Sequence, residues 1–93
     1  MYATIRSYSG SELADALATR QSDIRQVLEE IDGFRAYYLI RTTDGNAVTV
    51  SVFDDQAGAE ESTRAAAAWV GENLADLAIS PPQVTTGEVT FSF

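Results

Sequence analysis

Cysteine, histidine and lysine are all absent from this 93-residue chain. Without cysteine there can be no disulfide, thiolate nucleophile, iron–sulfur cluster or thiolate-bound zinc. Without histidine the chain lacks the commonest general base, metal ligand and haem ligand. Any chemistry must therefore come from carboxylates, arginine, tyrosine, hydroxyls, amides, the single tryptophan or a bound molecule. We expect no metal and no cofactor, so purified protein should carry neither haem nor flavin.

Positive charge is scarce, with six arginines against fourteen acidic residues and a net charge of −8. Such a chain repels a phosphate backbone, which argues against a nucleic-acid partner. No apolar run approaches the ~20 residues that cross a bilayer, and no signal-peptide core follows Met1. We expect a single domain over residues 1–93, no membrane partner and a cytoplasmic location.

Two β-rich runs, residues 34–42 and 47–53, flank Asp44-Gly45-Asn46 and predict an antiparallel hairpin. A two-residue loop is the default for such a turn. A three-residue loop would instead gather an uncharged face, and we favour that register. This face would consist of Phe34, Ala36, Tyr38, Ile40, Val48, Val50 and Val52.

The opposite face of the hairpin mixes arginine with large apolar side chains, namely Arg35, Tyr37, Leu39, Arg41 and Phe53. Aromatic residues and arginine are enriched where protein surfaces meet, so we expect these five residues to form a dimer interface. An ordinary solvated sheet face is the alternative interpretation.

The remaining elements follow from periodicity. Residues 2–8 alternate as a strand, and a helix of about twenty residues follows, capped by Ser9 or Ser11 and ending near Ile31. A second helix starts at Asp54 or Asp55 and runs to about Leu77, and residues 84–93 alternate as the last strand. The order β-α-β-β-α-β predicts a ferredoxin-like α+β fold with a four-stranded antiparallel sheet.

Right-handed crossovers put both helices on one face of that sheet and leave the other bare. Two copies packed through their bare faces would form a dimeric α+β barrel, so we expect a homodimer. Arg6 and Glu88 are predicted to pair on this face.

Several stretches resemble the small antibiotic biosynthesis monooxygenase-like proteins of the dimeric α+β barrel superfamily. They are Ile31-Asp32-Gly33-Phe34, Tyr37-Tyr38-Leu39, the Asp44-Gly45 turn, the strand Val48 to Phe53, and the alanine-rich helix with Trp69-Val70. The resemblance implies a homodimer with a pocket between sheet and helices. Characterised members oxidise aromatic polyketide-type substrates without metal or flavin, or degrade haem. The haem-degrading members use a first-strand asparagine and a helix histidine and tryptophan. Only Trp69 matches that set, which excludes haem degradation.

Trp69, Asn73 and Tyr38 are the candidate substrate-binding residues. Trp69 either stacks on a planar ligand or fills the core. Asn73, one turn later, either faces the same ligand or lies in solvent at the helix end, and Tyr38 either lines a cavity or packs structurally. No catalytic residue is identified. Two hypotheses follow: a cofactor-independent monooxygenase acting on a small aromatic molecule, or a non-catalytic dimeric binding or accessory domain. A roomy cavity beside Trp69 would favour the first, and a filled core the second.

Overall fold

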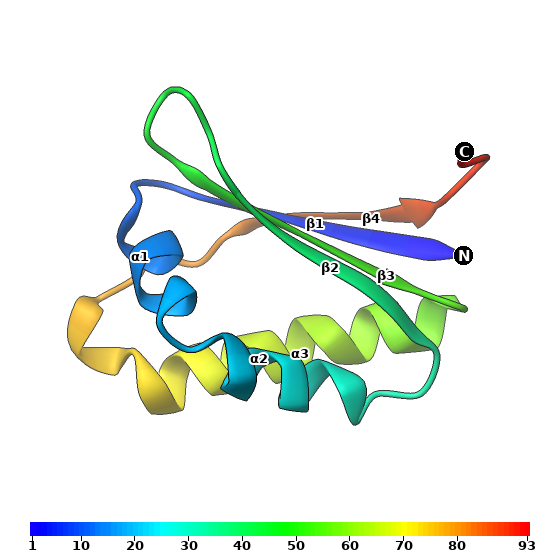
Figure 1. Cartoon of the computed structure of the whole chain (residues 1–93), viewed down its shortest axis with the longest axis horizontal. Coiled ribbons are helices and arrows are strands. Elements are labelled where there is room, and N and C mark those ends of the chain that lie inside the picture. The colour runs from blue at the N-terminus through cyan, green and yellow to red at the C-terminus, as the bar shows by residue number, and fades with distance from the viewer.

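The protein is described here by a computed structural model of residues 1–93. Its elements in chain order are β1 (Tyr2–Tyr8), α1 (Glu12–Ala18), α2 (Gln21–Glu29), β2 (Phe34–Arg41), β3 (Ala47–Phe53), α3 (Gln56–Asn73), the 3-10 turn η1 (Ala75–Leu77) and β4 (Gln83–Glu88). The strands form one antiparallel sheet in the order β2-β3-β1-β4. All helices lie on one side of this sheet, and the other side is open (Figure 1). The predicted ferredoxin-like α+β fold is therefore confirmed.

The expected first helix is two helices, α1 and α2, that meet at Thr19 and Arg20. The Thr19 hydroxyl donates to the carbonyl of Ala16 at 2.9 Å, and Arg20 has non-helical backbone angles. Threonine in this role ends a helix by competing for its last carbonyls. Because of this break, the chain has three α-helices instead of the two predicted.

The hairpin has the favoured register. Tyr38 lies opposite Val50 and Ile40 opposite Val48, which leaves a three-residue loop with Gly45 at φ 85°. Glycine is the residue that adopts this left-handed conformation most easily. A bulge at Arg35 then shifts Phe34 opposite Phe53, so Phe34 leaves the face on which the sequence placed it.

The two sheet faces are exchanged relative to the sequence prediction. Along β3 the buried side chains are Ala47, Thr49, Ser51 and Phe53, which point to the helices, while the valines between them lie on the open face. Tyr37 and Leu39 also face the helices, and Arg35 and Arg41 pair with Asp54 and Asp15. The prediction that Arg35, Tyr37, Leu39, Arg41 and Phe53 form a dimer interface on the bare face is therefore wrong.

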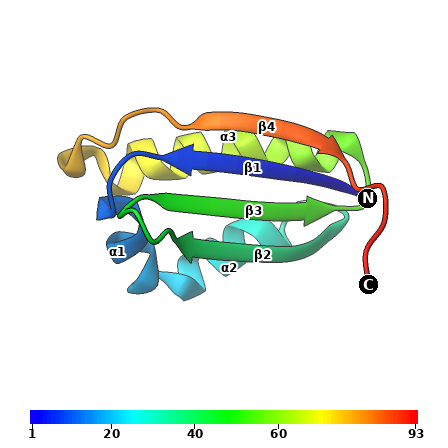
Figure 2. The ribbon, with the colours of Figure 1, turned by 90° about the horizontal axis from the view of Figure 1, so that it is seen from above.

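The open face carries no charged side chain. Its residues are Ala3, Ile5, Ser7, Ala36, Tyr38, Ile40, Val48, Val50, Val52, Gln83, Thr85 and Gly87. Ile5, Tyr38 and Ile40 are 39%, 58% and 43% exposed. The ribbon seen from above shows that no helix covers this side of the sheet (Figure 2).

The ends of α3 and β4 differ from the prediction. Asp55 is the N-cap of α3 and accepts from the Gly58 backbone N–H at 3.0 Å, but the helix ends at Asn73 instead of Leu77. β4 stops at Glu88 because its partner strand begins at Tyr2, and the last bond runs from Val89 N–H to the Met1 carbonyl. Residues 90–93 continue past the sheet. No helix is both long and apolar enough to cross a membrane.

Candidate functional site

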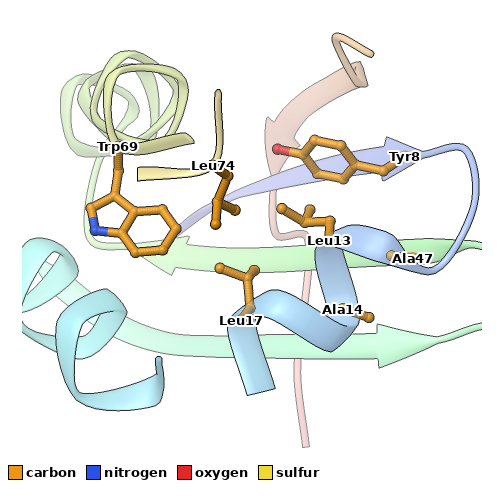
Figure 3. Packing of buried hydrophobic residues seen from close by; sticks show 7 residues of the cluster. All are labelled: Tyr8, Leu13, Ala14, Leu17, Ala47, Trp69 and Leu74. Carbon is orange, nitrogen blue, oxygen red and sulfur yellow. The ribbon is translucent and has the colours of Figure 1, made fainter. Parts of the chain in front are cut away.

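The core between sheet and helices has an apolar part and a hydroxyl-rich part. The apolar cluster contains Tyr8, Leu13, Ala14, Leu17, Ala47, Trp69 and Leu74 (Figure 3). Next to it, β1 and β3 direct Thr4, Arg6, Thr49 and Ser51 towards α3, and all four are buried. Polar side chains in such a position need hydrogen-bond partners.

Arg6 lies at the centre of the hydroxyl-rich part and is only 2% exposed. Its Nη1 donates to Ser51 Oγ at 3.2 Å, and its Nη2 donates to Ser62 Oγ at 2.7 Å and Thr63 Oγ1 at 3.3 Å. None of these partners is a carboxylate. Burial lowers the pKa of Arg6, because desolvation disfavours the charged guanidinium.

Two buried polar atoms have no hydrogen-bond partner, Arg6 Nε and Thr49 Oγ1. Arg6 and Thr49 are direct cross-strand partners on the helix-facing side. Both line a cavity of about 30 Å³ together with Tyr8, Tyr37 and Trp69. That volume accommodates roughly one water molecule. The unpartnered groups and the void therefore coincide.

The two tyrosines of this cavity keep their protons at neutral pH. Burial raises the pKa of Tyr37 to about 12. Burial also raises the pKa of Tyr8, although the nearby charge of Arg6 opposes that shift. Both phenols are thus hydrogen-bond donors and not bases under ordinary conditions.

Trp69 is buried, with 9% of its surface exposed, and Figure 3 shows its ring beside Leu17 and Leu74. The guanidinium carbon of Arg20 lies 5.9 Å from its ring centroid. Asn73 donates its amide N–H to the Trp69 carbonyl at 3.0 Å and accepts from Arg20 at 3.5 Å. Trp69 and Asn73 are therefore neighbours, but the Asn73 amide bonds to the helix backbone and to Arg20.

Tyr38 does not join Trp69 and Asn73. Its side chain belongs to the open face, and the helix-facing neighbour Tyr37 lines the cavity beside Trp69 instead. Arg6 does not meet Glu88 either, because Val84 lies opposite Arg6 and Tyr2 lies opposite Glu88. Arg6 therefore lies on the helix-covered face of the sheet and not on the bare face where it was predicted. Thr4, Arg6 and Tyr8 occupy alternate positions of β1, and each carries a polar group that can form a hydrogen bond in the core. This shared property is the sequence feature that could have indicated that they face the helices.

A larger groove opens between α2 and β2. It encloses about 600 Å³ and is lined mainly by apolar and aromatic side chains, including Leu17, Ile24, Leu28, Phe34 and Tyr37. Tyr38, predicted to bind a substrate, also lines this groove, at its border with the open face. Leu17, Ile24, Leu28 and Tyr37 also line the small central cavity, so the two spaces adjoin. Arg25, Glu29 and Arg35 contribute the charged groups of its lining. No three carboxylates are grouped so that they could hold a metal ion.

No family model matches the sequence, and no curated protein sequence matches it. Solved structures do resemble it. The monooxygenase from the ActVA-Orf6 gene of Streptomyces coelicolor, in complex with nanaomycin D, gives a TM-score of 0.71 at 15% identity, covering 99% of this chain and 89% of that one. A mutant of SnoaB, a cofactor-independent oxygenase from Streptomyces nogalater, gives 0.68 at 15% identity, covering 98% and 94%.

A mutant of MhuD with two manganese protoporphyrin IX molecules bound per active site gives a TM-score of 0.75 at 14% identity, covering 100% of this chain and 98% of that one. At such identities the likeness concerns the path of the backbone and does not extend to individual site residues. The chain has the fold of the antibiotic biosynthesis monooxygenase-like proteins.

Proposed function

We propose that this chain binds a small aromatic molecule in the groove between α2 and β2. The observation that carries the proposal is the groove itself, whose volume of about 600 Å³ lies within the range of small-molecule sites. Its walls combine aliphatic side chains with Phe34 and Tyr37, which suit a planar ring. The cavity beside Trp69 is too small for such a ring, so the ligand lies beside Tyr37 and not against Trp69.

The experiment is calorimetric titration of wild-type protein with a panel of planar aromatic compounds, repeated on a variant with a filled groove. Ala18 is exposed and lines the groove, so Ala18→Phe fills it without disturbing the core. Ala68→Phe is the matched control, since Ala68 is an exposed alanine of α3 outside the groove. We expect saturable binding that Ala18→Phe weakens and Ala68→Phe leaves unchanged. Equal affinities in the two variants would contradict the assignment.

We further propose that the functional unit is a homodimer formed through the open face. An uncharged surface of this extent is unusual on a chain in which 22% of residues are charged. A second copy has the same apolar composition, and two sheets pack face to face at about 10 Å. The partner would cover Ile5, Tyr38 and Ile40.

A second candidate function is monooxygenation of the bound aromatic molecule without a cofactor. The shared fold with SnoaB supports it. In such a reaction an activated CH₂ group of a phenolic substrate loses both hydrogens, one atom of O₂ becomes the carbonyl oxygen, and the other leaves as water with those hydrogens. The substrate supplies all the electrons. Tyr37, held protonated, can donate a hydrogen bond to a developing oxyanion.

Oxygen uptake distinguishes this candidate from the non-catalytic alternative. Wild-type protein with an activated phenolic substrate and a metal chelator should consume one O₂ for each carbonyl formed, and Ala18→Phe should slow the reaction. The packed core around Trp69 favours the non-catalytic alternative, because it leaves the indole no room to contact a substrate. Binding without oxygen uptake would establish that alternative.

A further inference from the structure

We propose that Arg6 and Thr49 form a buried site for one small anionic group, either a free halide-sized ion or the ionised oxygen of a ligand. The site rests on these two residues and the cavity between sheet and helices. Only the second source of the anion depends on the proposed aromatic ligand.

Arg6 has no counter-charge in the protein. Arg25, Arg35, Arg41 and Arg64 each pair with a carboxylate at the surface, and Arg20 lies over the Trp69 ring. Arg6, the remaining arginine, is buried and contacts only hydroxyls, in a chain with fourteen acidic residues. An uncompensated buried charge is strongly unfavourable, so a fixed cation here calls for an anion.

The polar groups around the cavity are suited to binding an anion. Arg6 Nε carries a proton and has no acceptor. The Thr49 hydroxyl across from it is a neighbour of the Tyr37 hydroxyl but forms no hydrogen bond of ordinary geometry. Tyr8, Tyr37 and Trp69 also line the cavity and can donate, and no carboxylate lines it. The polar groups around the void are thus mainly donors. A water molecule could satisfy the two free atoms but would leave the positive charge unbalanced.

The cavity has the size of a single small anion. A cavity of about 30 Å³ admits a monatomic anion or a single oxygen, and excludes a ring or a sulfate ion. The cavity adjoins the α2–β2 groove through Leu17, Ile24, Leu28 and Tyr37. An aromatic ligand in the groove could therefore direct one ionised oxygen past Tyr37 towards Arg6.

Bromide is the probe for the anion. Its binding would be followed by the unfolding temperature at constant ionic strength, balanced with sodium sulfate, and by anomalous diffraction from bromide-soaked crystals. Thr49→Val removes only the free hydroxyl and keeps the side-chain shape. Arg6→Met removes the charge, and Arg64→Met removes a surface arginine as control. Because every variant experiences the same general salt effect, the difference between variants isolates the site.

We expect an anomalous peak between Arg6 and Thr49 and a saturable rise in the unfolding temperature of the wild type relative to that of Arg6→Met at the same bromide concentration. Thr49→Val should weaken bromide binding about tenfold, because the variant lacks one hydrogen bond to a charged group. Arg6→Met should abolish binding, and Arg64→Met should match the wild type. If Arg6→Met does not fold, the anomalous diffraction of the bromide-soaked crystals and the bromide dependence of Thr49→Val test the site instead. Bromide dependence equal in wild type and Thr49→Val, or no anomalous peak at the cavity, would overturn the site.

4-Nitrophenolate and its neutral ether 4-nitroanisole distinguish the two possible sources of the anion, a free ion and the ionised oxygen of a ligand. If the ligand supplies the oxygen, nitrophenolate binds more tightly than the ether, competes with bromide and loses this advantage in Arg6→Met. If both compounds bind equally, or neither binds, while bromide still binds, the anion is a free ion. Failure of both aromatic probes would count against the proposed groove ligand and leave the Arg6–Thr49 site standing.

Discussion

Replacing Trp69 by alanine tests the central packing of the molecule. The indole is 9% exposed and lies in one cluster with Tyr8, Leu13, Leu17 and Leu74. The adjoining cavity is only about 30 Å³, so the neighbours already contact most of the ring. Trp69→Ala therefore removes a large buried side chain and leaves a void that rigid strands on one side cannot fill. Such truncations cost about 3 to 5 kcal/mol.

That loss is large for a chain of this length. By the usual range per residue, the whole free energy of unfolding is roughly 5 to 14 kcal/mol. With an m value of about 1 kcal/mol/M, the urea midpoint should fall by roughly 3 M or more. Unfolding is best followed by far-ultraviolet circular dichroism, since the variant has no tryptophan fluorescence.

Two companion variants separate packing from other contributions. Trp69→Phe keeps an aromatic ring in the cluster and should recover most of the stability. Arg20→Gln removes the cation lying 5.9 Å from the ring centroid and should cost only ~0.5 to 1 kcal/mol. A loss below about 1 kcal/mol in Trp69→Ala would refute the packing argument, because it would mean that the ring borders an open pocket.

Three further predictions address the interface, the buried phenol and the surface. If the proposed homodimer forms through the open face, Tyr38→Glu should give a monomer in light scattering, because it places a charge on that face. Leu39→Glu should instead unfold the chain, because Leu39 faces the helices. A dimeric Tyr38→Glu protein would exclude this interface. Tyr37 has its pKa raised from 10.0 to about 12, so the folded state holds the proton more tightly. The resulting contribution of Tyr37 to the free energy of unfolding is complete below pH 10. It is lost as the pH rises towards 12, by up to about 1.4 kcal/mol per pH unit. Tyr37→Phe should flatten that part of the pH–stability curve, and an unchanged slope would disprove the assignment. Arg41→Gln breaks an exposed pair with Asp15 and should change stability by less than about 1 kcal/mol in urea titrations.

Element type and order could be predicted from the sequence because local signals agree with the tertiary structure. Alternation defined β1 and the hairpin, Asp55 capped α3, and Asp44-Gly45 fixed a turn in which glycine is needed. The break between α1 and α2 was missed because Leu13, Leu17, Ile24 and Leu28 keep helical spacing across it. Periodicity indicates which side chains share a face, but it does not reveal that the hydroxyl of Thr19 ends a helix.

The sheet faces could not be assigned from hydrophobicity. The more apolar face, with Val48, Val50 and Val52, is open, and the face with Arg6, Thr49 and Ser51 is covered by α3. Ser62 and Thr63 on α3 supply partners for Arg6, and only the three-dimensional arrangement brings them within reach. For the same reason Trp69 and Asn73 were found as neighbours from their spacing, while Tyr37 and Arg6 became candidates only in the structure.

The hydrogen bond from Val89 to Met1 brings both ends of the chain to the same end of the sheet (Figure 2). The closing tail is short, and its last aromatic residues, Phe91 and Phe93, are 73% and 114% exposed. A brief glycine-rich linker could therefore join Phe93 to Met1 and leave the sheet order intact. Reopening the chain at Gly45, where nothing lies within 4 Å of an added Cβ, would give a circular permutant that begins at β3 and ends at β2. The same proximity means that affinity tags at either terminus occupy one end of the molecule, away from the hairpin loop.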